Sequence, residues 1–299
     1  MTRLTKVISR GEKSWYRHHQ IDDQQTIQSL EALSIPFSEI TNILSEKGIA
    51  RYSQYQKKDK THQSYYVLTV LQSVKKEEKE TDYYSREPFT FVFSKTELYT
   101  FSRTFSLNIS EIKKSDITVE QLIILLLIKI YETILENLAY IRQRIKYLED
   151  NATALRYNGP LYELLSLKKS VVHFSIILEN NKKILDEFRF KKEAFLNPDK
   201  LDHFEVLSSQ ANLLVEEYQE LLTQISDLFV SIGSNRLNQI MKTLTTLSII
   251  LTLPTIISGL WGMNVKIPWE NSTHGFEILI VLNILAVVMT AFFLNKKDL

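Results

Sequence analysis

Two long uncharged runs near the C-terminal end of the sequence constrain its fold more than any other feature. The first run covers residues 243–265 and the second covers residues 278–295. About 20 mostly apolar residues are enough for a helix to cross the hydrocarbon core of a bilayer. We therefore expect a hairpin of two membrane spans, at about 243–263 and 278–295. A buried hairpin in a soluble protein is the alternative, although runs of this length are unusual in core helices.

The charges beside the two runs predict an orientation. Arg236 and Lys242 precede the first run, and the basic tail "NKKDL" follows the second, whereas the connection between them carries Lys266 against Glu270 and Glu277. Basic residues favour the cytoplasmic side of a membrane. We expect a multi-pass protein of the cell membrane with both termini in the cytoplasm.

The rest of the chain divides into two further parts. Residues 1–115 contain stretches suited to β-strands, at 63–73 and at 88–102, where "SKTE" splits the second stretch as a hairpin loop would. The charged segment 74–87 between them predicts a solvated loop, and "DDQQTIQSLEALSI" predicts a helix after an Asp cap. We expect an α/β cytoplasmic domain over 1–115.

Residues 116–240 predict long helices. Apolar residues recur at three- and four-residue spacing from Val119 onward, with breaks at "NGP" (158–160) and "NPDK" (197–200). A third helix begins near Leu201 and meets no proline before Pro254, so it is expected to continue into the first span. Residues 241–299 then form the transmembrane domain. The predicted fold is therefore α+β, followed by long helices and a two-helix membrane hairpin.

Composition argues against several classes of function. With 36 basic and 35 acidic residues, the chain lacks the positive charge that nucleic-acid binding requires. Cysteine is absent, which removes disulfides and thiolate metal sites. The six histidines are scattered or directly adjacent, with no metal-binding spacing and no nucleophile motif. We therefore expect no enzyme activity.

Polar and small residues in the first span recur at alternating steps of three and four, which places them on one stripe of a helix. In membrane proteins such a stripe either allows close packing of helices in lipid or lines a water-filled path in an oligomer. The stripe alone favours packing. Its members are Asn238, Met241, Thr245, Ser248, Thr252, Thr255 and Gly259.

A cation path along this stripe would have no carboxylate. Mg²⁺ gives up its water reluctantly, so a lining of hydroxyls and amides would have to pass the ion hydrated. The side-chain oxygen of Asn264, at the end of the span, could accept hydrogen bonds from those waters. A ring of such amides around a symmetry axis could act as a filter.

Several motifs resemble the CorA magnesium transporter family. They are "SNRLNQIMKTLT" (234–245), a proline within the span, the tripeptide Gly262-Met263-Asn264, and a second span ending in "KKDL". The tripeptide matches the family signature, with Trp261 in the place that Tyr usually fills. The likeness is strong over about the last 75 residues and weaker elsewhere.

This resemblance implies a homopentamer in the membrane lipid, with a CorA-like funnel of long helices and a pore lined by five copies of the first span. It implies passive Mg²⁺ uptake, with Co²⁺ and Ni²⁺ as possible further ions. A zinc-transporting branch of the same fold is the alternative, although the intact tripeptide favours magnesium. A membrane-anchored coiled-coil adaptor without transport is the alternative from another class.

The resemblance also assigns roles to residues of the first span. Asn264 forms the filter ring that holds the hydrated ion, and Gly262 and Met263 shape the backbone around it. Met241 and Leu244 form a hydrophobic constriction toward the cytoplasmic end. The other pore-lining positions are Asn238 below the constriction, and Ser248, Thr252 and Thr255 above it.

Asp227 is expected to be one half of a regulatory Mg²⁺ site between subunits, through which cytoplasmic Mg²⁺ would close the channel. Its carboxylate partner is not identified, with Asp59, Asp202 and Glu205 as candidates. Lys266 lies two residues beyond the filter. We expect its side chain to turn outward, because five lysines at the entrance would repel a cation.

Overall fold

A computed structural model gives the fold. It describes residues 15–20, 23–45, 48–56, 64–77, 81–104, 118–151, 159–191, 198–263 and 273–296. The chain forms two compact units, Met1–Ser226 and Asp227–Leu299. The division into domains 1–115, 116–240 and 241–299 remains a prediction.

The first unit contains a five-stranded sheet with strand order β1-β5-β4-β3-β2. β1 pairs with β5 in parallel, and the other pairs are antiparallel. The strands predicted at 63–73 and 88–102 are confirmed, and the break at "SKTE" separates β4 from β5. β1 and β2 were not predicted. The strands are β1 (Trp15–Gln20), β2 (Arg51–Gln56), β3 (Ser64–Lys76), β4 (Tyr83–Phe93) and β5 (Glu97–Ser102).

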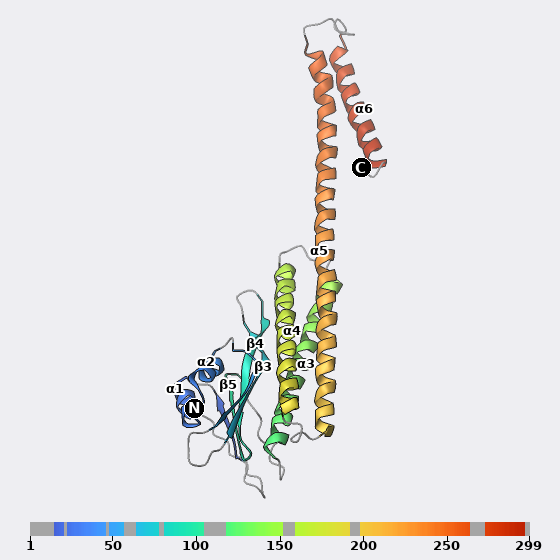
Figure 1. Cartoon of the computed structure of the whole chain (residues 1–299). Helices are drawn as coiled ribbons and strands as arrows, with labels where there is room; N and C mark the ends of the chain where they lie inside the picture. The colour runs from blue at the N-terminus through green and yellow to red at the C-terminus, as the bar shows by residue number, and fades with distance from the viewer. Residues whose placement is uncertain are drawn as a thin grey trace. The chain divides into compact units, whose positions relative to one another are not determined.

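Helices cover both faces of this sheet (Figure 1). The short helices α1 (Asp23–Ala32) and α2 (Phe37–Leu44) lie on one face, and the long helices α3 (Val119–Asn151) and α4 (Gly159–Lys191) lie on the other. The helix predicted after the Asp cap is therefore confirmed, and so are the two long helices. The core beneath α1 and α2 is built from Leu30, Ile40 and Ile43 on the helices and Val67, Val92 and Phe101 on the strands.

The prediction of a loop over the charged segment 74–87 is wrong at both of its ends, because β3 runs to Lys76 and β4 begins at Tyr83. Polar side chains of α4 bind the backbone of this extended hairpin. Ser170 Oγ accepts the N–H of Tyr84 at 2.9 Å, and Ser166 Oγ donates to the carbonyl of Asp82. The charged sequence of this hairpin would suit a solvated loop, but hydrogen bonds from the neighbouring helix α4 hold its backbone.

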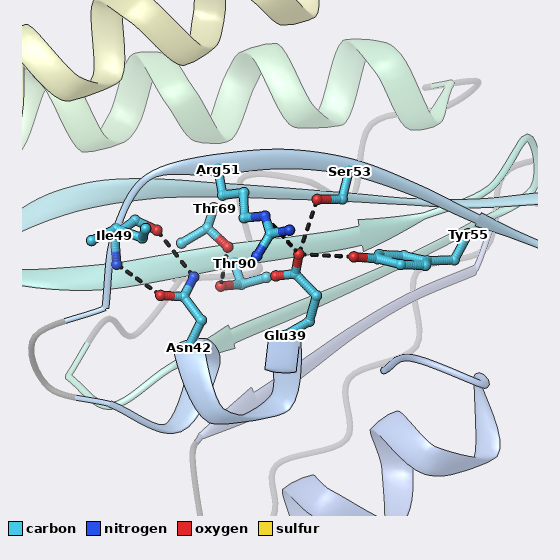
Figure 2. A network of polar contacts seen from close by, with 8 residues as sticks. All are labelled: Glu39, Asn42, Ile49, Arg51, Ser53, Tyr55, Thr69 and Thr90. Carbon is cyan, nitrogen blue, oxygen red and sulfur yellow. Dashed lines mark hydrogen bonds and ion pairs between the residues drawn. The ribbon is translucent and has the colours of Figure 1, made fainter. Parts of the chain in front are cut away.

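A buried carboxylate on α2 holds the edge strand β2 (Figure 2). Glu39 Oε1 accepts hydrogen bonds from the hydroxyls of Ser53 and Tyr55, both at 2.9 Å. Arg51 Nε lies 3.0 Å from the same oxygen, and the Glu39 side chain is fully buried. The connection before β2 is also close-packed, because a Cβ at Gly48 would lie 2.4 Å from a backbone carbonyl oxygen of α2.

The helix predicted to run from the long-helix region into the first span is confirmed as α5 (Pro198–Trp261), which continues through Pro254. Within the first unit, α5 packs its apolar face on α3. The rings of Tyr131 and Phe204 meet edge to face with their centroids 4.8 Å apart. Burial raises the pKa of the Tyr131 hydroxyl to about 12. The second unit adds α6 (Gly275–Lys296).

Candidate functional site

The second unit exposes an unusual amount of apolar surface. Helices α5 and α6 are each long and apolar enough to cross a membrane, and none of their most apolar 18-residue windows is buried inside the chain. Among the exposed side chains are Leu247, Leu251, Val288 and Phe292, each more than half exposed. Apolar helices without a protein covering are what a bilayer accommodates. A hairpin buried within the chain is therefore the wrong interpretation.

The predicted polar stripe of α5 is solvent-exposed along its whole length. Met241 and Leu244, the predicted constriction, are 55% and 57% exposed. Because no described residue covers the stripe, it can contact water or other copies of the chain. Asp227 extends the stripe, since steps of four, three and four lead through Ser231 and Ser234 to Asn238.

Three hydroxyls of the stripe form the same type of hydrogen bond within the helix. Each donates its proton to the backbone carbonyl four residues earlier: Ser248 to Leu244 at 2.9 Å, Thr252 to Ser248 at 2.7 Å, and Thr255 to Leu251 at 2.9 Å. A hydroxyl has one hydrogen and two acceptor lone pairs. With its hydrogen used inside the helix, each oxygen presents only acceptor capacity to its surroundings.

An open groove of about 420 Å³ runs along the same part of α5. It brings together Leu244, Ser248 and Thr252, three of the predicted pore-lining residues. The apolar residues that complete the groove were not predicted from the sequence. All of its lining residues come from one helix: Leu244, Thr245, Ser248, Ile249, Thr252, Leu253 and Ile256. Their spacing, with alternating steps of one and three residues, is the sequence signal that could have identified them.

The predicted filter lies at the boundary of the described residues. Asn264 and Lys266 fall outside them, whereas Gly262 and Met263 follow the end of α5. The Gly262 N–H donates to the carbonyl of Ser258 at 3.0 Å, and Met263 is 53% exposed. A Cβ at Gly262 would make only ordinary contacts, the nearest at 3.5 Å. Packing within the chain therefore does not require glycine here.

The regulatory site at Asp227 remains a prediction, because its second half would come from a neighbouring subunit. Asp227, Asp202 and Glu205 are all exposed on α5, and Asp59 lies outside the described residues. Within the described ranges, no group of three or more His, Asp or Glu side chains could hold a metal ion. A site at Asp227 would need ligands from another copy or from water.

Comparison with known proteins agrees with this arrangement. The chain is 28% identical over 171 residues to the cobalt/magnesium transport protein CorA of Methanocaldococcus jannaschii. The match covers 56% of this chain and 53% of that protein, so the chain spans about half the length of this curated relative.

Solved structures share the fold. The complete structure of the CorA magnesium transporter from Methanocaldococcus jannaschii matches with a TM-score of 0.75 at 21% identity, covering 96% of this chain and 92% of that one. The cytoplasmic domain of ZntB from Vibrio parahaemolyticus matches with a TM-score of 0.54 at 14% identity, covering 75% of this chain and 88% of that one. At these identities the likeness concerns the fold alone.

A family model matches nearly the whole sequence. The model describes the CorA-like Mg²⁺ transporter proteins and aligns with residues 12–297, from ahead of β1 to beyond α6. It therefore includes the α/β domain, the long helices, the tripeptide and both apolar helices. This chain belongs to the CorA-like Mg²⁺ transporter family.

Proposed function

We propose that several copies of this chain form a membrane pore that conducts hydrated divalent cations, with Mg²⁺ as the main ion. The observation that carries the proposal is the common hydrogen bonding of the Ser248, Thr252 and Thr255 hydroxyls. Their hydroxyls donate inside the helix and offer only lone pairs outward. Membership in a family of transporters supports the same function and argues against an enzyme.

The chemistry of a hydrated cation fits such a lining. The waters bound to Mg²⁺ turn their oxygens to the ion and their hydrogens outward, so the pore wall has to accept hydrogen bonds. Because Mg²⁺ keeps several of its waters in most protein sites, a wall of acceptors is better suited to it than a cage of carboxylates. No charged residue lies between positions 243 and 265, so the wall does not trap the ion by charge.

The pore would be built by a ring of subunits, and we propose five. In this arrangement the exposed stripe of each α5 faces the symmetry axis, and α6 faces lipid. Met241 and Leu244 form a hydrophobic constriction, with Asn238 below it. Asn264 of each subunit contributes its amide oxygen to a filter at the outer end, shaped by Gly262 and Met263. Co²⁺ and Ni²⁺ would be further substrates.

We further propose that both termini are cytoplasmic and that Asp227 binds internal Mg²⁺ to close the pore. Its exposure and its place on the stripe support a site formed between copies. Asp227→Asn should weaken the inhibition of flux by internal Mg²⁺, and Glu216→Gln serves as an exposed acidic control on the same helix. An inhibition curve unchanged by Asp227→Asn would remove Asp227 from regulation.

The lining hydroxyls can be tested in proteoliposomes loaded with a Mg²⁺-sensitive dye. Thr252→Val keeps the side-chain shape and removes the acceptor oxygen, so Mg²⁺ influx should fall severalfold. Thr243→Val is the matched control, because Thr243 also donates to a carbonyl four residues earlier, at 2.9 Å, but lies off the stripe. Equal influx through the two variants would refute the proposed lining.

A further inference from the structure

Helix α4 and strand β4 run side by side in the same direction. Ser166 Oγ donates to the carbonyl of Asp82, and one helical turn later Ser170 Oγ accepts the N–H of Tyr84 at 2.9 Å. Four helical residues rise about 6 Å, and two strand residues advance by about 7 Å. The helix and the strand therefore keep step, so the next turn of α4 lies beside the next residues of β4.

Three basic side chains gather at this next turn. By the same spacing, His173 of α4 lies within one residue of the level of Arg86 on β4. Lys169 precedes His173 by four residues, so both lie on one face of α4. The ammonium of Lys169 lies 3.4 Å from the centre of the Tyr83 ring, and the His173 ring stacks on the same ring with the centroids 6.2 Å apart. All four side chains are partly covered.

The charges around His173 are of one sign. Burial lowers the pKa of its imidazole, and the two charged groups that lower this pKa further are Arg86 and Lys169. Within the part of the chain that the structure describes, Arg86 forms no ion pair. Two fixed positive charges thus lie close together at a site that is only partly open to water.

The acidic residues nearest in sequence are bound elsewhere. Asp82 forms an ion pair with Lys75 of β3. The buried carboxylate of Glu87 accepts the N–H of Arg103 at 3.0 Å and the hydroxyl of Thr104 at 3.1 Å. Neither carboxylate is therefore available to balance the basic group on α4 and β4.

The hydrogen bonding of His173 indicates which ring nitrogen faces outward as a donor. Its Nδ1 is buried and has no hydrogen-bond partner among the described residues. A buried N–H without an acceptor is rarer in proteins than a buried lone pair without a donor, and a neutral imidazole carries one hydrogen. We therefore assign this hydrogen to Nε2, which can donate it to a bound group.

We propose that Arg86, Lys169 and His173 bind the phosphate group of an anionic ligand between β4 and α4. A guanidinium can hold two phosphate oxygens at once, and the Lys169 ammonium and His173 Nε2 supply further donors. A phosphate monoester carries about −1.5 to −2 charges at neutral pH, which matches the two fixed positive charges. The site lies in the first unit, so the proposal does not depend on the proposed pore or on the transported ion.

Thermal unfolding of the full-length protein in detergent tests the site, in Mg²⁺-free buffer at pH 7. A ligand that binds only the folded state raises the midpoint as its concentration rises. Inorganic phosphate should do so to saturation, whereas sodium chloride at the same ionic strength should not. Arg86→Gln should weaken the apparent affinity by about tenfold or more, since it removes hydrogen bonds between charged groups.

Lys182→Gln is the matched control, because Lys182 is an exposed lysine of α4 outside the basic group. Equal phosphate affinities of Arg86→Gln and Lys182→Gln would overturn the proposal. If Arg86→Gln does not fold, as judged by circular dichroism, Lys169→Gln replaces it in the same comparison.

The same measurement distinguishes a free phosphate from a lipid headgroup. The probes are inorganic phosphate, glycerol phosphate, and detergent micelles containing phosphatidic acid, with phosphatidylcholine micelles as the reference. Saturation by the water-soluble probes would support the site and identify a free phosphate compound as its ligand. A shift with phosphatidic acid alone, lost in Arg86→Gln, would support the site and identify a lipid headgroup. No shift with any of the three probes would overturn it.

Discussion

The side chain of Asn181 forms two hydrogen bonds with the backbone of Leu71. The Leu71 N–H donates to Asn181 Oδ1 at 2.7 Å, and Asn181 Nδ2 donates to the Leu71 carbonyl at 2.8 Å. The pairing of β2 with β3 ends at Thr69, so Leu71 lies just beyond the end of the edge strand. The buried amide on α4 therefore takes the place of a strand and fixes α4 to the sheet.

Asn181→Ala should destabilise the protein by about 2–4 kcal/mol, because it leaves a buried N–H and a buried carbonyl without partners. Asn180→Ala is the matched control, since the hydrogen bond that Asn180 forms among the described residues goes to Ile176 of its own helix, at 2.8 Å. Chemical denaturation of the full-length protein in detergent measures both. Similar losses from the two variants would contradict the role assigned to Asn181.

The ion pair between Arg51 and Glu39 should contribute far more than an ordinary surface pair. Arg51 is 47% exposed, but its partner Glu39 is fully buried, so Arg51→Met leaves a buried carboxylate without its countercharge. Loss of one partner of a buried pair costs about 3–5 kcal/mol, and the exposure of Arg51 places the expected loss at the lower end. Lys75 has the same 47% exposure, but its partner Asp82 is 39% exposed. Lys75→Met should therefore destabilise the protein much less than Arg51→Met, and equal unfolding free energies for both variants would be the contrary result.

His173 should make the stability of the protein pH-dependent. Its ring stacks on Tyr83 with the centroids 6.2 Å apart, and the ammonium of Lys169 lies 3.4 Å from the centre of the same Tyr ring. Burial lowers the pKa of His173 below its ordinary value of 6.5, and the charges of Arg86 and Lys169 lower this pKa further. The unfolded chain therefore takes up the proton first as the pH falls. Stability is fully present above about pH 6.5 and is lost as the pH drops from there through the folded pKa.

Thermal unfolding of the full-length protein between pH 7.5 and pH 5 measures this effect. His173→Phe keeps an aromatic ring on Tyr83 and should flatten the pH dependence. His203→Gln changes an exposed histidine of α5 and should leave it as it is. A His173→Phe variant with the full pH dependence of the original protein would show that other groups are responsible.

The sequence predicted the long elements well, because their signals are local. Apolar periodicity was enough to place α3 and α5, and the uncharged runs were enough to place both membrane helices. The extended hairpin between β3 and β4 was missed for a physical reason. Its charged residues suit a loop, and the groups that hold it, Ser166 and Ser170 of α4, are distant in the sequence. Edge strand β2 was missed for the same reason, since Glu39 and Gly48 lie outside it.

The candidate site, too, could be predicted from the sequence only in part. Helical spacing placed Ser248 and Thr252 on one stripe, and the structure brings them together in one groove. The inward-donating state of their hydroxyls depends on helical backbone geometry, which residue types alone do not specify.

The proposed filter is central to the transport mechanism, and Mg²⁺ influx through the Asn264→Ala variant tests it most directly. The variant should assemble as the original protein does, with the same mass in detergent by light scattering. Its influx in proteoliposomes should fall to the level of protein-free vesicles, because the amide oxygen that would hold the hydrated ion is gone. An assembled Asn264→Ala protein that conducts Mg²⁺ at the original rate would contradict the proposed filter.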